Sequence, residues 1–156
     1  MYIFKSDAGC FLPNRKGECE MTIQKNVVLW DNGRDRLCLL RVPFEQQYKY
    51  IDGVPCITFG ISYESTIYKG YDVFTLFDHF YSDIVSAIEK TYRTLDGTFR
   101  IDDAGADTDG YISFEMQNGR LCVKGRLGAS FSSHSLIFDF EADQTLVGNL
   151  LKSLAV

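Results

Sequence analysis

The sequence predicts an α+β domain in which a single antiparallel, meander-rich β-sheet carries two helices on one face. Three observations lead to this prediction. Stretches with apolar residues at every second position recur along the chain between turn residues, as in hairpin-connected strands. Two stretches, at about 76–95 and 143–155, instead space their apolar residues three and four positions apart, as on one face of a helix. The length of 156 residues suits one domain, so we assign residues 1–156 to a single domain.

The first half of the chain has the pattern of strands joined by tight turns. The strand-like stretches are residues 1–4, 19–30, 36–44, 54–64 and 66–74. Asn32-Gly33 and Asp52-Gly53 stand between them and are typical of hairpin turns, because these residues tolerate the positive φ angles that a tight turn needs. We expect hairpins at both places.

The main helix is expected at about 76–95. Thr75 and Asp78 have the spacing of a capping box at its start, and Gly97 stands where a left-handed residue would end it. The second helix begins after Asp143, whose short carboxylate can accept a hydrogen bond from a backbone N–H of the first turn. Its leucines must then fold back onto the sheet.

Four strands follow the main helix as a meander. Apolar and polar residues alternate in residues 99–102, 112–117, 120–127 and 135–141, and Asn118-Gly119 is the strongest hairpin signal in the chain. The apolar face of this meander needs a cover, and we expect the two helices to supply it. The opposite face is rich in charged residues that can form cross-strand ion pairs in water.

The composition excludes several functional classes. A net charge of −5 is unlike that of a general nucleic-acid binder, which needs a basic face. No apolar run approaches the ~18 residues that a membrane span requires. Five cysteines occur without a Cys-x-x-Cys pair, and the first residues lack the pattern of a secretion signal. We therefore expect a cytoplasmic protein with reduced thiols and no contact with nucleic acid or membrane.

Motifs for catalysis or metal binding are absent from the sequence. The stretch 102–110 resembles a calcium loop, but the EF-hand pattern would put Gly105 and Met116 at two positions that require oxygen ligands. His79 and His134 are the only histidines, and neither is spaced with other ligands as in a metal cluster. We therefore assign no catalytic residue, no metal site and no cofactor.

Two features indicate protein recognition. The segment 102–109 contains four aspartates and no basic residue, a fixed negative charge that can steer a basic partner. Tyrosines flank turns in the middle of the chain, and tyrosine is favoured at interfaces; the alternative is that these tyrosines belong to the core. The candidate partner-binding residues are Asp102, Asp103, Asp107, Asp109, Tyr63 and Tyr68.

Residues 71–156 resemble a known family. The strand Leu136-x-Phe138-x-Phe140 is followed by Asp143-Gln144-Thr145 and a helix with leucine spacing. This arrangement resembles the C-terminal signature of the WapI-like immunity proteins, bacterial antitoxins encoded beside contact-dependent polymorphic toxins. The resemblance extends to three shorter elements: Leu95-Asp96-Gly97, Gly110-Tyr111-Ile112 and Val123-Lys124-Gly125.

The resemblance implies a cytoplasmic protein that is not an enzyme and that blocks one cognate toxin domain by binding it. Such toxins are frequently basic and include nucleases, so an acidic inhibitor would complement them. Two other classes stay open. One is a small-molecule binder or an enzyme, which would need a deep apolar pocket with convergent polar groups. The other is an adaptor subunit of a permanent assembly.

Overall fold

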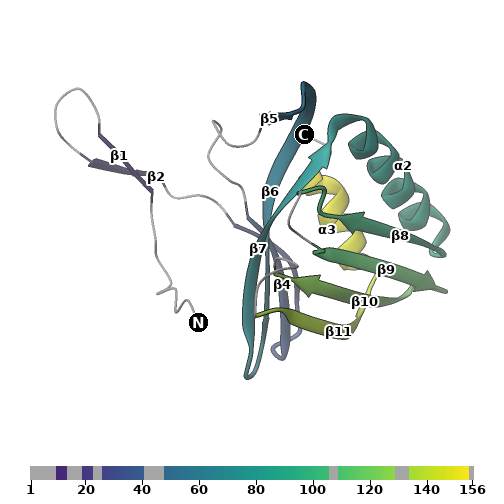
Figure 1. The fold of residues 1–156 in the computed structure, drawn as a ribbon. Coiled ribbons are helices and arrows are strands. Elements are labelled where there is room, and N and C mark those ends of the chain that lie inside the picture. The colour runs from purple at the N-terminus through teal and green to yellow at the C-terminus, as the bar shows by residue number, and fades with distance from the viewer. Residues whose placement is uncertain are drawn as a thin grey trace.

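The structure, a computed structural model, describes residues 10–13, 19–22, 26–40, 48–105, 109–128 and 134–154 (Figure 1). The α+β class is confirmed, since two helices accompany strands that all pair antiparallel. The expectation of a single sheet is wrong. The described strands form a five-stranded sheet, a four-stranded sheet and a separate two-stranded pair. That pair consists of β1 (Cys10–Pro13) and β2 (Cys19–Thr22).

The five-stranded sheet is built around its longest strand, β6 (Val54–Ser65). One edge of β6 pairs with β4 and β5, and the other edge pairs with β7, while β3 pairs with β4. The other strands span Val27–Asp31 (β3), Asp35–Leu40 (β4), Tyr48–Ile51 (β5) and Lys69–Phe77 (β7). The predicted Asp52-Gly53 turn is confirmed, because both residues have positive φ angles, 51° and 79°, between β5 and β6.

The four-stranded sheet is the predicted meander, with strand order β11-β10-β9-β8. Its strands span Gly97–Asp102 (β8), Tyr111–Gln117 (β9), Arg120–Leu127 (β10) and Leu136–Asp143 (β11). Asn118 and Gly119, with φ angles of 51° and 81°, form the expected two-residue turn between β9 and β10.

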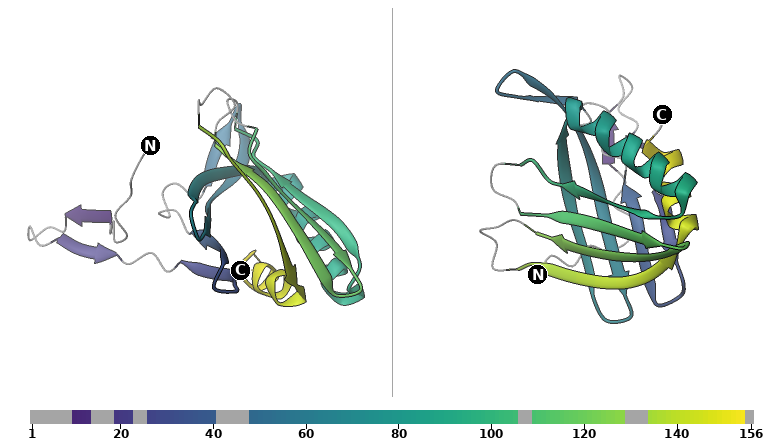
Figure 2. Two further views of the ribbon diagram at one scale, coloured as in Figure 1. Left: turned by 90° about the horizontal axis from the view of Figure 1, so that it is seen from below. Right: turned by 90° about the vertical axis from the view of Figure 1, so that its right-hand side faces the viewer.

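The core lies between these two sheets, whose strands cross at a steep angle in Figure 2. Tyr63 of β6 stacks on Phe138 of β11 with ring centroids 4.3 Å apart, and Phe74 of β7 is fully buried. The prediction that the two helices are the only cover for the meander is therefore wrong. Residues 54–77 form an apolar sheet face of their own, and alternation alone does not tell whether two sets of strands share one sheet or face each other.

The two helices pack against each other beside the sheets. Helix α2 (Asp78–Thr94) runs beside β8, and helix α3 (Gln144–Leu154) packs against both α2 and β3 (Figure 2). Asn149 of α3 donates a hydrogen bond of 3.1 Å to the backbone carbonyl of Leu29 in β3. Helix α3 thereby closes the side of the core next to β3.

The helix ends agree with the predictions in one case and not in the other. Asp143 accepts a 2.7 Å hydrogen bond from the Thr145 backbone N–H, which confirms the predicted cap of α3. The predicted capping box of α2 is wrong, because Thr75 is a residue of β7 and its hydroxyl lies 3.4 Å from that of Thr58. The left-handed residue at the end of α2 is Leu95, with φ of 56°, two residues before Gly97.

Candidate protein-binding groove

The three predicted aspartates that the structure describes lie near one another at the end of β8, and Asp107 lies outside the described residues. Asp102 forms an ion pair of 2.7 Å with Arg100 on the same strand. Asp109 forms one of 2.5 Å with Arg126 of β10. Two carboxylates of a segment that contains no basic residue are thus partly neutralised by arginines that the fold places beside it. The local field is weaker than the sequence alone implies.

Asp103 has a structural role in this segment. Its carboxylate accepts hydrogen bonds from the backbone N–H groups of Thr75, at 2.9 Å, and Gly105, at 3.1 Å. The Ala104 N–H in turn donates to the Thr75 carbonyl at 2.8 Å. The segment after β8 is therefore fastened along the edge of β7, where it satisfies backbone groups that an exposed edge would leave open.

The two candidate tyrosines have different environments. Tyr63 is 5% exposed, stacks in the core, and donates a 2.7 Å hydrogen bond to Asp35, so it belongs to the core and offers no surface to a partner. Tyr68 is 62% exposed at the tip of the β6–β7 hairpin, beside Ile67, which is 78% exposed. Of the two, only Tyr68 is placed where another molecule can reach it.

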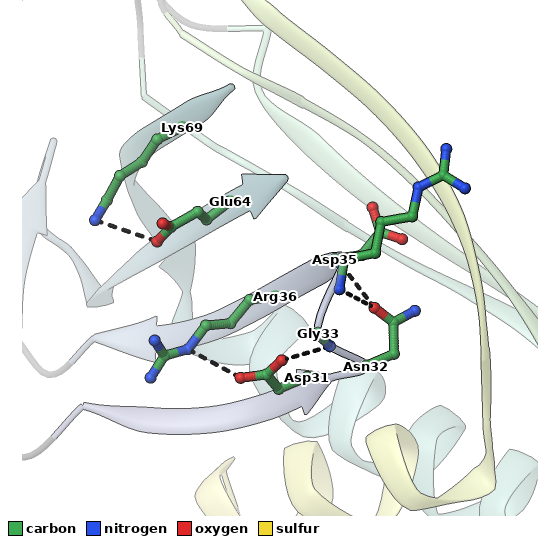
Figure 3. A network of polar contacts seen from close by, with 8 residues as sticks. Asp31, Asn32, Gly33, Asp35, Arg36, Glu64 and Lys69 are labelled. Carbon is green, nitrogen blue, oxygen red and sulfur yellow. Dashed lines mark hydrogen bonds and ion pairs between the residues drawn. The ribbon is translucent and has the colours of Figure 1, made fainter. Parts of the chain in front are cut away.

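A polar network shapes the turn between β3 and β4 and holds the acceptor of the Tyr63 hydroxyl (Figure 3). The Asn32 side chain accepts hydrogen bonds from the backbone N–H groups of Arg34 and Asp35, at 2.9 and 2.6 Å. Asp31 accepts one from the Gly33 N–H at 2.9 Å and lies 3.6 Å from Arg36. These side chains bond to one another and to the backbone N–H groups of the turn, so we assign them no further chemistry.

A groove with a volume of about 470 Å³ opens between α2 and β8. The helix and the strand meet at the turn around Leu95 and Gly97, and the groove extends from the middle of α2 to the far end of β8. Its apolar wall comes from the end of β7, the first half of α2 and β8. The residues that form this wall are Leu76, Phe77, Phe80, Ile84, Ala87 and Phe99.

The rim of the groove is mainly acidic. Asp83 of α2 and Asp102 and Asp103 at the end of β8 line it, and Arg100 is the one basic residue among the residues that line it. The Arg100 guanidinium is already engaged, since it pairs with Asp102 and lies 4.0 Å from the centre of the Tyr111 ring. The groove therefore combines an apolar wall with an excess of negative charge at its mouth.

One feature of the sequence points to this groove, namely the apolar stripe of α2. The apolar stripe predicted for residues 76–95 includes Phe80, which lines the groove and whose side chain is 51% exposed. Only Ile88 and Thr91 of this helix are fully buried. A stripe wider than the core needs is typical of a helix that also contacts a second molecule.

The described residues offer little for catalysis. Among them, no three His, Cys, Asp or Glu side chains are grouped so as to hold a metal ion. His79 packs against the rings of Phe77 and Phe80, with centroids 5.8 and 4.1 Å away. Burial, together with the hydrogen bond to Asp35, raises the pKa of the Tyr63 phenol to about 12, which stabilises its neutral form. Within the described part of the chain, neither helix has the length and apolar character to cross a membrane.

Comparison of the chain with protein-family models gave no match, and comparisons with curated proteins and with solved structures also gave none.

Proposed function

We propose that this protein is a bacterial immunity protein that neutralises a cognate toxin domain in the cytoplasm by covering its functional surface. The observation that carries the proposal is the groove between α2 and β8, with an apolar wall and an acidic rim. An exposed apolar patch rimmed by polar groups is typical of a protein-binding site. Asp143-Gln144-Thr145 and its flanking elements resemble the WapI-like immunity proteins, and this resemblance supports a toxin domain as the partner.

The chemistry of the groove indicates how a toxin would be held. An aromatic or aliphatic side chain of the toxin enters between Phe80 and Phe99, where contacts with both walls exclude water. Lysine or arginine beside that anchor reaches Asp83 and Asp102 at the rim. The net charge of −5 attracts a basic partner at long range, so the rim contributes mainly to the rate of association.

The proposal is tested by co-expression with the product of the adjacent gene. We expect the chain to restore growth of cells that produce the toxin and to co-purify with it. If it does neither, the protein is not the immunity protein of that toxin and the proposal fails for this pair.

Variants of the groove locate the contact. Phe80→Lys places a charge in the apolar wall at a half-exposed position, so the fold should tolerate it while toxin affinity falls by roughly tenfold or more, as for loss of a buried anchor. Glu115→Lys changes an exposed residue on β9 and is the matched control. Equal affinity of the two variants would place the toxin elsewhere on the surface.

The charge of the rim is tested separately. The double change Asp83→Lys and Asp102→Lys should slow association with the toxin, and the difference should shrink as salt is added, because rim charges act through screened long-range attraction. Asp103 and Asp109 are left intact in this experiment, since their contacts with Thr75 and Arg126 hold the segment in place. An association rate that does not respond to salt would exclude the rim as a steering element.

A second function is favoured by the volume of the groove. About 470 Å³ lies within the range of small-molecule pockets, roughly 300–1,000 Å³, and the apolar wall suits an aromatic or aliphatic ligand. A thermal-shift screen with aromatic and aliphatic compounds distinguishes this alternative. The small-molecule role is favoured if a ligand stabilises the unmodified chain but not Phe80→Lys. The same ligand should then leave toxin protection unchanged.

A further inference from the structure

The edges of the two large sheets differ in how they are covered. An uncovered edge strand presents a row of unpaired N–H and C=O groups that can pair with another strand. On the β7 edge, the backbone of Thr75 forms hydrogen bonds with Asp103 and Ala104. Farther along β7, the Asp72 carboxylate accepts hydrogen bonds from the N–H groups of Val73 and Gly128. On β3, the Leu29 carbonyl accepts a hydrogen bond from Asn149 of α3. Helix α2 stands beside β8, and β5 is only four residues long.

The outer edge of β11 lacks such a cover among the described residues. This strand of eight residues ends the four-stranded sheet, pairs with β10 alone, and receives no backbone hydrogen bond on its other side from any described segment. The view from below in Figure 2 looks onto this edge, and no helix or strand lies across β11 there. No described segment occupies these backbone groups, so we take them as the place for one further strand.

The side chains of β11 alternate between the core and the surface. Phe138 and Phe140 point into the core, while Asp139, Glu141 and Asp143 are exposed on the outer face. Ile137, at the start of the same outer row, is 71% exposed. Asp139 pairs only loosely with Lys124, at 4.0 Å. The outer row of β11 is therefore only weakly neutralised and can attract basic side chains of a neighbouring strand.

An apolar flank lies near the start of β11. Gly70 of β7 packs so closely against Leu136 that a Cβ at Gly70 would lie 3.2 Å from the Leu136 Cβ. Tyr68 and Ile67, at the tip of the same β6–β7 hairpin, are 62% and 78% exposed. Figure 1 shows this hairpin reaching past β11. A strand added to β11 would therefore run from an apolar flank into a row of carboxylates.

We propose that β11 binds an extended segment of another protein as an additional strand of the sheet, and that this segment alternates basic and apolar residues. The apolar residues of the segment continue the inner face beside Phe138 and Phe140. Its lysines or arginines lie on the outer face opposite Asp139 and Glu141, where oppositely charged cross-strand neighbours are stabilising. This inference concerns a different surface from the groove and does not depend on the identity of the toxin.

The charge of β11 disfavours a second copy of the chain as the occupant. Two β11 strands paired antiparallel would bring Asp139, Glu141 and Asp143 of one copy beside the same carboxylates of the other. Like charges directly opposite each other across two strands are destabilising. A basic segment removes this repulsion.

The test uses the full chain and a fluorescent eight-residue peptide of alternating lysine and valine, which matches the length of β11. We expect saturable binding at low salt, and slowed amide hydrogen exchange confined to residues 136–143. The double variant Asp139→Lys and Glu141→Lys should bind roughly tenfold more weakly, the loss expected for two surface ion pairs. Glu115→Lys, on the same face two strands away, should bind like the unmodified chain.

Two further peptides separate strand addition from simple charge attraction. They carry the same side chains, but N-methyl groups remove the backbone donors from one or the other alternate set of residues. At least one of them should lose binding, because a strand donates along only one of its edges to β11. Undiminished binding of both methylated peptides, or slowed exchange elsewhere than β11, would overturn the proposal. Dimerisation of the chain without peptide that is abolished by the Asp139→Lys and Glu141→Lys pair would also overturn it, in favour of a second copy.

Discussion

The ring of Phe138 lies directly over the backbone of Gly125, its cross-strand partner in the four-stranded sheet. A Cβ built on Gly125 would approach the Phe138 Cε1 to 2.7 Å, closer than real Cβ atoms come to their neighbours. The glycine therefore makes room for an aromatic ring at the centre of the inter-sheet core, where Phe138 also stacks on Tyr63. This explains in physical terms why the strand Val123-Lys124-Gly125 carries a glycine.

Substitution of this glycine should destabilise the core. Gly125→Ala forces the Phe138 ring out of its position and should lower the free energy of unfolding by about 1–3 kcal/mol, the usual cost of overpacking. Urea unfolding followed by far-UV circular dichroism measures the change. Lys124→Ala, at the exposed neighbouring position, is the control and should stay within about 0.5 kcal/mol. Equal stability of the two variants would contradict the steric role of Gly125.

The hydrogen bond between Tyr63 and Asp35 should contribute measurably to stability. Tyr63→Phe keeps the stacked ring but removes the hydroxyl, and we expect a loss of about 1–2 kcal/mol for a buried hydrogen bond to a carboxylate. Chemical unfolding at neutral pH measures it. Tyr50→Phe, at a 75% exposed position, is the matched control and should not change stability.

The same tyrosine predicts a dependence of stability on alkaline pH. Burial and the bond to Asp35 raise the pKa of Tyr63 from 10.0 to about 12 in the folded state, so the folded form favours the neutral phenol. Its contribution is complete below pH 10 and is lost as the pH rises from 10 through 12. Unfolding curves between pH 8 and 12 should therefore fall more steeply for the unmodified chain than for Tyr63→Phe. Parallel curves would contradict the assignment.

Loss of the Asp143 cap should weaken α3. Asp143→Ala removes the 2.7 Å bond to the Thr145 N–H and should cost about 0.5–2 kcal/mol, whereas Asp143→Ser keeps a capping oxygen and should restore most of the stability. Thermal unfolding of the two variants gives the comparison. A serine variant as unstable as the alanine variant would show that the cap is not the source of the effect.

We expect Asp103 to contribute mainly to the stability of the fold and less to partner binding. Asp103→Ala leaves the Thr75 N–H without its side-chain acceptor and should destabilise the chain by about 1–3 kcal/mol. Asp103→Asn keeps an acceptor oxygen and should cost less. Hydrogen exchange at the Thr75 amide is the direct readout, since it should speed up in the alanine variant. Unchanged exchange there would mean that the segment does not depend on this carboxylate.

The sequence carried enough information for the meander and much less for the arrangement of the two sheets. Asn118-Gly119 and Asp52-Gly53 dictate tight turns through local backbone preference, so the hairpins around them could be predicted. Whether β6 continues the meander or faces it depends on contacts such as Tyr63 with Phe138, which are 75 positions apart and leave no local pattern.

The candidate site shows the same division. The acidic character of residues 102–109 could be read from the sequence, but the pairing of Asp109 with Arg126 could not, because the arginine comes from a strand farther along the chain. Tyr63 and Tyr68 look alike as tyrosines near a turn. They differ because Tyr63 belongs to the inner row of β6, while Tyr68 stands beyond the end of that strand. The groove forms only when α2 and β8 are both in place. The apolar residues of α2 were therefore the only part of it that the sequence could indicate.

The open edge of β11 also has a consequence for handling the purified protein. A strand that accepts a foreign segment can nucleate aggregation when that segment is missing, and the carboxylates of its outer row are then its main protection. At the isoelectric point, about pH 5.0, the net charge that keeps copies of the chain apart falls to zero. The free protein should therefore precipitate most readily near pH 5, and a bound basic strand should keep it in solution.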